Sequence, residues 1–259
     1  MQSSTEKPGS LTRAEREQRA YDEAGVWERS HRWHTQFQHV FACPNTLRYE
    51  ELFNKAMQDV AGKRVLEIGC GEGGAAAKAS AFGASYVLGM DISRQYIRTA
   101  KQKEIKGKLE FLLGDVSEPL RPSFDVIFGR SILHHLDYRR VLLRLFQRNL
   151  SSGGAMFFME PFGSNPMIRL YHRFANAHTP DERSFTREDL NWLQTNFKDF
   201  TVHAVNLISF PVGLLSSLFL PTPDNVATRL ADRVDVSLAR HCRFLVPYYR
   251  HSVLFIRKP

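Results

Sequence analysis

The central part of the chain alternates short apolar runs with amphipathic stretches. Five runs have the length and composition of buried strands: Arg64–Ile68, Tyr86–Met90, Leu109–Leu113, Phe124–Phe128 and Ala155–Met159. Helical periodicity fills other intervals, at about residues 73–82, 94–104, 138–149 and 186–197. This alternation predicts βαβ crossovers, and therefore an α/β fold in which helices cover both faces of a parallel sheet.

Two later runs, Thr201–Leu207 and Ser252–Arg257, can complete a seven-stranded, mostly parallel sheet. Residues 208–251 form a 44-residue insertion between them, in which a helix is predicted near 224–240. One face of that helix carries Val226, Leu230, Val234 and Leu238, and another carries Arg229, Arg233 and Arg240. An insertion of this length and apolarity is typical of a pocket roof or of a subunit interface.

The first sixty residues have a different pattern. Residues 1–20 are polar and lack an apolar stripe, so they are predicted to form a flexible tail or a peripheral helix, with order beginning near Tyr21. Residues 21–60 carry aromatic side chains at loosely helical spacing, broken at Pro44. They predict an N-terminal helical cap, which either packs on the core of a 61–259 domain or forms a lid over its pocket.

Composition and charge narrow the class of protein. The chain has 259 residues, of which 43% are hydrophobic and 24% charged, which excludes a disordered, collagen-like or disulfide-scaffold class. The formal net charge of +8 permits a nucleic-acid partner. A group of basic residues follows Asp91 in a predicted helix and its exit, where a solvated outer face is expected: Arg94, Arg98, Lys101, Lys103, Lys106 and Lys108.

The cysteines and the apolar runs bear on the compartment. Cys43, Cys70 and Cys242 are odd in number and lack metal-ligand spacing, which favours reduced thiols in a cytoplasmic chain without a metal. The first twenty residues lack the apolar core of a secretory signal. No run reaches the roughly 18 apolar residues that a membrane span needs, so we expect none.

The strongest chemical signal is the sequence VLEIGCGEGG at residues 65–74. A strand is followed by Gly69, Gly71 and Gly73 before a helix begins, and such glycines allow a tight turn and the close approach of a ligand. Asp91 closes the second strand 24 residues after Glu67, where a carboxylate can accept both hydroxyls of a ribose. The GxGxG spacing lacks the arrangement that nicotinamide enzymes use to bind a pyrophosphate.

Two further motifs follow in order: Gly114-Asp115-Val116 after the third strand, and Arg130 with SILHHL at residues 131–136 after the fourth. On these motifs the sequence resembles the class I S-adenosylmethionine-dependent methyltransferases, in particular the broad bacterial group of the type 11 and type 25 kinds that act on small molecules. The resemblance covers about residues 61–161 and the final strand. It implies a Rossmann-like sheet, S-adenosylmethionine as cofactor and methyl transfer as the activity.

The resemblance also implies roles for the matching positions. The cofactor-binding positions are Glu67, Gly69, Cys70, Gly71, Asp91, Ile92, Asp115, Val116 and Arg130. Among them, Asp91 would hold the ribose and Asp115 would accept a hydrogen bond from the adenine amino group. Glu67 would support the glycine loop or bind the cofactor's amino group, and Arg130 would lie at the methionine end. A purely structural carboxylate is the alternative for Glu67.

Candidate catalytic residues follow from the position of ligands in open α/β sheets, beyond the carboxyl ends of the strands. That rule selects His134 and His135 after strand four and Glu160 after strand five. A histidine of near-neutral pKa can take a proton from a phenol, an acid or an amine, whereas a desolvated carboxylate can act as a base or stabilise a cation. The alternative is that the two histidines only begin a helix and bond to backbone.

The acceptor site is expected in the variable segments. Tyr21 and Trp27 in the cap are candidates, together with Arg169 and Tyr171 in a second cover segment, residues 161–200. Their aromatic and basic character favours an apolar or aromatic acceptor that carries an acidic group. A cover helix with solvated arginines is the alternative.

Three functions therefore stay open. The first is a methyltransferase for a small molecule of secondary or isoprenoid and quinone-like metabolism, with O-, N- or C-methylation undecided. The second is an RNA or protein methyltransferase, against which the sequence lacks an Asn-Pro-Pro-Tyr-type tetrapeptide for a flipped base and an RNA-binding motif, so we expect no nucleic-acid partner. The third is a non-catalytic cofactor-binding protein. A homo-oligomer built on the cap or the insertion is a further hypothesis.

Overall fold

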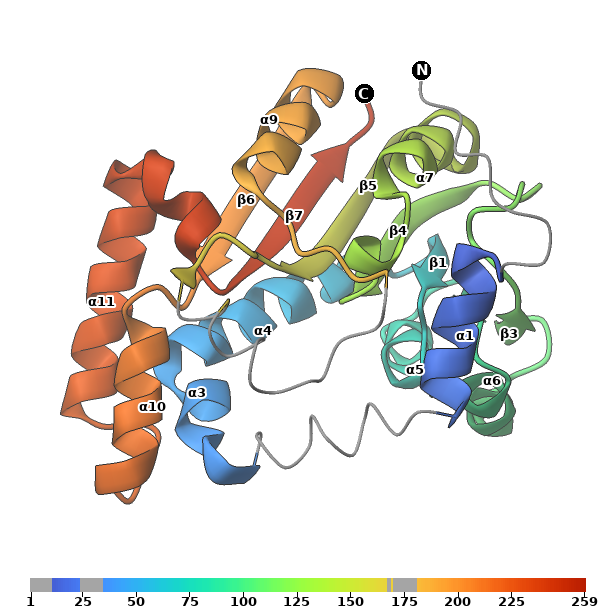
Figure 1. Ribbon diagram of the computed structural model, residues 1–259. Helices are drawn as coiled ribbons and strands as arrows, with labels where there is room; N and C mark the ends of the chain where they lie inside the picture. The colour runs from blue at the N-terminus through green and yellow to red at the C-terminus, as the bar shows by residue number, and fades with distance from the viewer. Residues whose placement is uncertain (1–10, 24–34, 167–168, 170–180) are drawn as a thin grey trace.

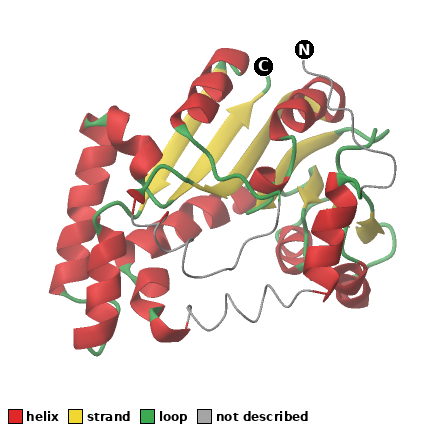
Figure 2. Cartoon of the chain, viewed as in Figure 1, coloured by secondary structure: helices red, strands yellow, loops and turns green. Residues whose placement is uncertain are grey.

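The computed structural model describes residues 11–23, 35–166, 169 and 181–259, and contains one seven-stranded sheet (Figures 1 and 2). The strand order is β3-β2-β1-β4-β5-β7-β6. The strands are β1 (Arg64–Ile68), β2 (Tyr86–Asp91), β3 (Leu109–Leu113), β4 (Phe124–Arg130), β5 (Leu150–Pro161), β6 (Asp199–Val205) and β7 (His251–Arg257). Strands β1 to β5 are parallel, and β7 runs antiparallel to both β5 and β6. The predicted fold class is confirmed.

Helices cover both faces of this sheet (Figure 1). The α-helices are α1 (Arg13–Glu23), α3 (Gln38–Ala42), α4 (Pro44–Gln58), α5 (Gly74–Ala81), α6 (Arg94–Ala100), α7 (Tyr138–Arg144), α9 (Arg187–Asn196), α10 (Ser209–Phe219) and α11 (Val226–His241). Tighter or wider turns are η1 (Lys101–Lys103), η2 (Leu133–His135), η3 (Leu145–Asn149) and η4 (Arg243–Tyr248). Alternate residues of β5 enter opposite cores, with Met156 and Phe158 in one and Phe157 and Met159 in the other. This two-sided burial explains the continuous apolar runs.

The strand and helix limits differ from the predicted ones where the sequence is polar or where a helix changes its winding. Strand β5 begins at Leu150 rather than Ala155. The intervening Ser-Ser-Gly-Gly sequence lacks the apolar pattern of a strand, yet Leu150 pairs with Phe124 of β4 ahead of a shift in register. Helix α6 ends in the 3₁₀ turn η1, and α7 ends in the π-helical turn η3. Both changes fall within the predicted helical intervals 94–104 and 138–149.

The predicted boundary after residue 20 falls inside helix α1. Residues 13–23 form a helix, the second of the two forms predicted for this segment, and polar contacts rather than an apolar stripe attach it to the domain. Arg16 Nε lies 2.7 Å from the Asp181 carboxylate, and Gln18 Nε2 donates to the Ile92 carbonyl at 2.6 Å. A search for hydrophobic periodicity misses such a helix because its attachments are hydrogen bonds and ion pairs.

Helix α4 forms the C-terminal part of the predicted cap, for which packing on the core and forming a lid were the two interpretations. Phe53 is buried and its ring lies 5.8 Å from that of Phe128 and 5.2 Å from that of Phe157, measured between centroids. Residues 44–58 therefore pack on the sheet as a core helix rather than forming a lid. Trp27 lies outside the described residues.

The insertion contains helices α10 and α11, and the orientation of α11 was not foreseen. Its predicted apolar face points outward, with Val226 74% and Leu230 60% exposed. Its buried side is polar, because the Asp235 carboxylate accepts backbone N–H groups of Leu207, Ile208 and Ser209 at 3.1, 2.7 and 3.0 Å. These bonds satisfy the backbone where β6 ends and α10 begins.

The basic residues around α6 are exposed, as expected of a solvated outer face: Arg94, Arg98, Lys101, Lys103, Lys106 and Lys108. They lie at the β3 edge of the sheet, opposite the β6 edge that the insertion covers (Figure 1). Among the described residues, none of the helices combines the length and the apolarity that crossing a membrane requires.

Replacing Asp235 with alanine is expected to lower the free energy of unfolding by about 2–4 kcal/mol, because three buried N–H groups lose their acceptor. Urea unfolding followed by circular dichroism measures the change. Asp224→Ala is the matched control, since the Asp224 carboxylate is 62% exposed, and it should change stability by less than about 0.5 kcal/mol. Equal effects of the two substitutions would contradict the assignment of Asp235 as the anchor of α11.

Candidate active site

The glycine loop after β1 adopts a conformation that requires glycine. Gly69, Gly71 and Gly73 have φ values of 65°, 50° and 78°, in the left-handed region. The Asp91 carboxylate holds the loop against the end of β2, because it accepts the Gly71 N–H at 2.8 Å and the Ser93 N–H at 2.9 Å. Burial raises the pKa of this carboxyl, while the hydrogen bonds to its charged form oppose the increase.

A cavity of about 480 Å³ lies beyond the carboxyl ends of β1, β2, β3 and β4. Seven of the nine predicted cofactor positions line it: Gly69, Gly71, Asp91, Ile92, Asp115, Val116 and Arg130. The motifs therefore converge at one edge of the sheet, as the parallel topology requires. Glu67 and Cys70, the other two positions, are buried and absent from the cavity wall.

Glu67 lies beneath the glycine loop with an unsatisfied atom. Its side chain is buried, and its Oε2 atom has no hydrogen-bond partner. Burial raises the pKa of the Glu67 carboxyl to about 8, although a hydrogen bond from the Ala76 backbone and the charge of Arg130 act against the rise. Burial likewise raises the pKa of the Cys70 thiol, which makes that cysteine a packing residue rather than a nucleophile.

Helix α1 covers the other side of the cavity. Arg13, Glu17 and Tyr21 all line it and are spaced four residues apart, so they share one face of the helix. Gln18 and Asp22 attach the same helix to the loop after β2, through the Ile92 carbonyl and the Ser93 hydroxyl. Sequence reasoning missed Arg13 and Glu17, although their four-residue spacing with Tyr21 was a usable signal.

His135 projects into the cavity between two side chains of α1. Its Nδ1 atom lies 3.1 Å from Glu17 Oε2, and its Nε2 atom lies 3.0 Å from the Tyr21 hydroxyl. Burial, followed by the charge of Glu17, raises the pKa of the Tyr21 phenol above its ordinary value. The phenol therefore stays protonated and can donate to Nε2, while the Glu17 carboxylate lies at ion-pair distance from Nδ1.

The carboxylate of Glu160 is desolvated, as predicted, and accepts hydrogen bonds from the backbone after β4. Its Oε1 atom accepts the N–H groups of Ile132 and Leu133 at 3.0 and 2.9 Å, and its Oε2 atom lies 2.6 Å from His134 Nδ1. The side chain is fully buried and is not part of the cavity wall, and neither is His134. The geometry thus gives Glu160 and His134 the positions of supports for the loop that presents His135.

Comparisons with known proteins bear on the family. Residues 66–158 match the family model described as "Methyltransferase domain". A ubiquinone biosynthesis O-methyltransferase of Neisseria meningitidis is 28% identical over 133 residues, which are 49% of this chain and 55% of that protein. A magnesium-protoporphyrin O-methyltransferase of Rhodobacter capsulatus is 33% identical over 107 residues, which are 39% of this chain and 47% of that protein. The chain thus spans about half the length of these relatives.

Solved structures match over more of the chain. A phosphoethanolamine N-methyltransferase 2 of Haemonchus contortus, in complex with S-adenosylhomocysteine, has a TM-score of 0.60 and 19% identity, covering 98% of this chain and 61% of that one. The magnesium protoporphyrin IX methyltransferase of Synechocystis PCC 6803 has a TM-score of 0.59 and 13% identity, covering 96% of this chain and 100% of that one. At these identities the likeness concerns the fold.

Residues 66–158 of this chain form a methyltransferase domain of the class I S-adenosylmethionine-dependent kind. The matched domain and the sheet topology together confirm the resemblance that the glycine loop, Asp91, Asp115 and the segment after β4 indicated.

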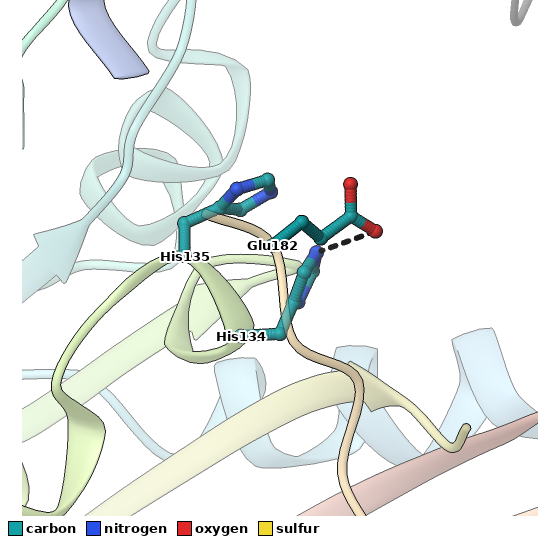
Figure 3. A group of neighbouring side chains, drawn as sticks. All are labelled: His134, His135 and Glu182. Atoms are coloured by element: carbon teal, nitrogen blue, oxygen red, sulfur yellow. Dashed lines mark ion pairs between the residues drawn. The ribbon is translucent and has the colours of Figure 1, made fainter. Parts of the chain in front are cut away.

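The methyltransferase fold also brings together a group of side chains from distant segments (Figure 3). One nitrogen each from His134 and His135 and one oxygen from Glu182 all lie within 4.8 Å of one another. His134 Nε2 and Glu182 Oε1 are 3.8 Å apart. Glu160 and Tyr21 hydrogen-bond to imidazole nitrogens of the pair, and Glu17 lies at ion-pair distance from a third nitrogen. Because these contacts account for the group, we assign no metal to it. The absence of a metal stays a prediction.

The remaining predicted acceptor residues are distributed unevenly. Tyr21 lines the cavity of the methyltransferase domain, whereas Arg169 is exposed and is not part of the cavity wall. Trp27 and Tyr171 lie outside the described residues. No residue of the insertion 208–251 lines this cavity in the described part of the chain, so α1 covers it and the insertion does not.

The pH dependence of stability tests the support given by His134. Burial acts to lower the pKa of its imidazole, but the charge of Glu160 and the hydrogen bond to it raise that pKa above the ordinary value. A raised pKa in the folded state stabilises the protein below the unfolded value, about 6.5, and this stabilisation is lost as the pH rises through the folded value. The stability advantage of the parent over His134→Gln should therefore be largest near pH 5.5 and shrink toward alkaline pH.

Urea unfolding of both proteins across that pH range measures the effect. His203→Gln is a control of opposite sign, because burial lowers the pKa of His203, so the parent's stability relative to this variant should rise with pH. A difference between the parent and His134→Gln that is the same at every pH would show that His134 gains nothing from Glu160 when it is charged.

Proposed function

We propose that this chain is an S-adenosylmethionine-dependent methyltransferase that acts on a small molecule. One observation carries the proposal: a single cavity has the glycine loop, Asp91 and Asp115 on one side, and His135 with its partners Glu17 and Tyr21 on the other. The first set provides the contacts that an adenosyl cofactor needs. The second provides a group that can accept a proton from a substrate.

The residues at the cavity fit S-adenosylmethionine. A Cβ atom placed on Gly71 would meet no atom within 4 Å, whereas one on Gly69 would collide with the Ile132 side chain. The loop therefore has open space over Gly71 but not over Gly69. Glu67 does not line the cavity, so its buried, unpartnered Oε2 atom offers no contact to a ligand there.

Each side of the cavity has a defined part in binding this cofactor. The Asp91 carboxylate would accept the two ribose hydroxyls with the lone pairs that its bonds to Gly71 and Ser93 leave available. Asp115 accepts the Ser117 N–H through Oδ1, at 2.7 Å, which leaves Oδ2 for the adenine amino group. The bound cofactor supplies an electrophilic methyl group on a sulfonium.

His135 would take the proton that leaves the acceptor. Its Nε2 atom faces the Tyr21 hydroxyl, so a proton can arrive there directly from the acceptor or through that hydroxyl. The Glu17 carboxylate at Nδ1 stabilises the imidazolium that results, because opposite charges in a buried site attract strongly. Helix α1 also excludes water from the cavity, which favours alignment of the reacting atoms.

The acceptor that this arrangement suits best is a small molecule with an O–H or carboxyl group on an apolar body. Apolar side chains of Met90, Ile92, Val116, Ile132 and Leu136 share the cavity wall with the polar groups. Several relatives support oxygen as the target, since they are named as O-methyltransferases of ubiquinone biosynthesis, of magnesium-protoporphyrin and of fatty acids. A homo-oligomer and a place in secondary or quinone-like metabolism stay predictions.

Asp91→Ala is expected to weaken S-adenosylmethionine binding at least about tenfold, because the ribose loses a charged acceptor and the Gly71 loop loses its attachment. Isothermal titration calorimetry with S-adenosylhomocysteine measures the loss. Asp199→Ala, an exposed aspartate at the distant β6 edge, should bind as the parent does. Unchanged affinity in Asp91→Ala would refute the cofactor assignment.

His135→Gln is expected to lower kcat at least about 100-fold while S-adenosylhomocysteine binding changes less than about twofold, because it removes the proton acceptor and leaves the glycine loop intact. Transfer of label from methyl-labelled S-adenosylmethionine to a panel of phenols, fatty acids and amines measures activity. His241→Gln, an exposed histidine of α11, serves as the control. If a productive acceptor is methylated equally fast by His135→Gln, His135 is not the base.

A further inference from the structure

Helix α11 is folded with its polar side inward. The positions that face the domain are Thr228, Ala231, Asp232 and Asp235. The positions that face outward include Val226, Leu230 and Val234, which are 74%, 60% and 38% exposed. A surface helix of a globular protein ordinarily buries its apolar stripe, so the outward stripe on α11 calls for a partner.

Helix α10 also exposes large apolar side chains. Its buried positions include Gly213 and Ser216; Gly213 lies against the backbone of Val40, and the Ser216 hydroxyl contacts His39 Nδ1 at 2.9 Å. Its outward positions are larger and apolar, since Leu215 and Leu218 are 58% exposed and Phe219 is 78% exposed. Phe210 of α10 also packs with Val40 in a small buried cluster, so α10 is attached by both apolar and small or polar residues. The large residues toward the end of the helix, Leu215, Leu218 and Phe219, remain outside.

The two helices present these side chains together. Helices α10 and α11 lie side by side beyond β6, at the left edge of the molecule in Figure 1. We define the outer face of the insertion by eight of its exposed apolar residues: Leu215, Leu218, Phe219, Leu220, Val226, Leu230, Val234 and Phe244. These residues surround the turn between the helices and extend along α11 to η4.

The charges on this part of the surface have one predominant sign. Residues 209–248 contain three acidic residues, and Asp232 and Asp235 are buried on the inner side of α11. Asp224 is exposed, and its carboxylate lies 3.0 Å from Arg229. Four arginines are exposed alongside the apolar residues: Arg229, Arg233, Arg240 and Arg243. The outer face is therefore apolar and cationic.

We propose that the outer face of the insertion binds the surface of an anionic lipid bilayer. Apolar side chains of a helix that lies in the interface enter the boundary between headgroups and acyl chains, while the neighbouring arginines pair with lipid phosphates. Both requirements are met here on one surface. A second copy of the chain fits less well, because a two-fold interface would bring the arginines of both copies together. Asp224 is the exposed carboxylate that the insertion offers to balance them, and it already pairs with Arg229.

This proposal does not depend on the methyltransferase reaction. The outer face lies at the β6 edge of the sheet, and none of its residues lines the cavity. Loss of membrane binding and loss of cofactor binding are therefore separate results. Helices α10 and α11 would lie on the bilayer rather than enter it as spanning segments.

Sedimentation with vesicles tests the proposal. The full chain should bind vesicles of phosphatidylcholine containing one third phosphatidylglycerol, and bind vesicles of phosphatidylcholine alone at least about tenfold more weakly. The double variant Phe219→Ser/Leu230→Ser should lose at least about tenfold in affinity for the anionic vesicles, because two inserted apolar side chains are removed. Arg233→Gln/Arg240→Gln should lose affinity and weaken the salt dependence of binding.

Matched controls lie at the opposite edge of the sheet. Ile105→Ser replaces an apolar side chain that is 50% exposed, and Lys106→Gln/Lys108→Gln removes two exposed charges; both variants should bind like the parent. Equal binding by parent and Phe219→Ser/Leu230→Ser would overturn the proposal, as would a parent that binds neither vesicle. A dimer in light scattering that the same double variant converts to a monomer, without vesicle binding, would assign the face to a second copy instead.

Discussion

The buried carboxylate of Glu160 determines the course of the chain where the active site is built. It stands at the end of β5 and accepts the backbone N–H groups of Ile132 and Leu133, while its other oxygen bonds to His134. The loop that it holds contains Ser131 at φ 50°, a conformation that a residue with a side chain adopts at a cost. Without this acceptor, several buried donors in the loop that carries His135 would be unsatisfied.

The cavity is bounded by that loop and by helix α1, which is attached to the domain by different contacts from those of helix α4. Helix α4 is attached to the sheet by the buried ring of Phe53, as core helices ordinarily are. Helix α1 is attached by Arg16 to Asp181, by Gln18 to Ile92 and by Tyr21 to His135, all through polar atoms. Polar contacts on this side of the cavity thus take the place of the aromatic packing that attaches α4 to the sheet.

The insertion shows the limit of an amphipathic pattern. Val226, Leu230 and Val234 share a face of α11, as their spacing required, yet that face points away from the protein. The orientation comes from Asp235 and Asp232, whose carboxylates accept bonds from the β6–α10 junction and from Asn45 and Arg48. A helical period reveals that a face exists; which side is buried depends on partners more than 20 residues away in the chain.

The sequence by itself determined the sheet, the order of the cofactor motifs and their meeting at one edge, because strand burial and the left-handed glycines after β1 are local properties. Asp91, Asp115 and Arg130 follow from their places at strand ends. Only the tertiary structure separated His135, at the cavity, from His134 and Glu160 behind it, and only it brought Glu17 and Tyr21 to that histidine. The contact between Tyr21 of α1 and His135 joins segments more than 100 residues apart in the chain. A hydrophobic period or a motif spacing in one sequence does not reveal such a pairing.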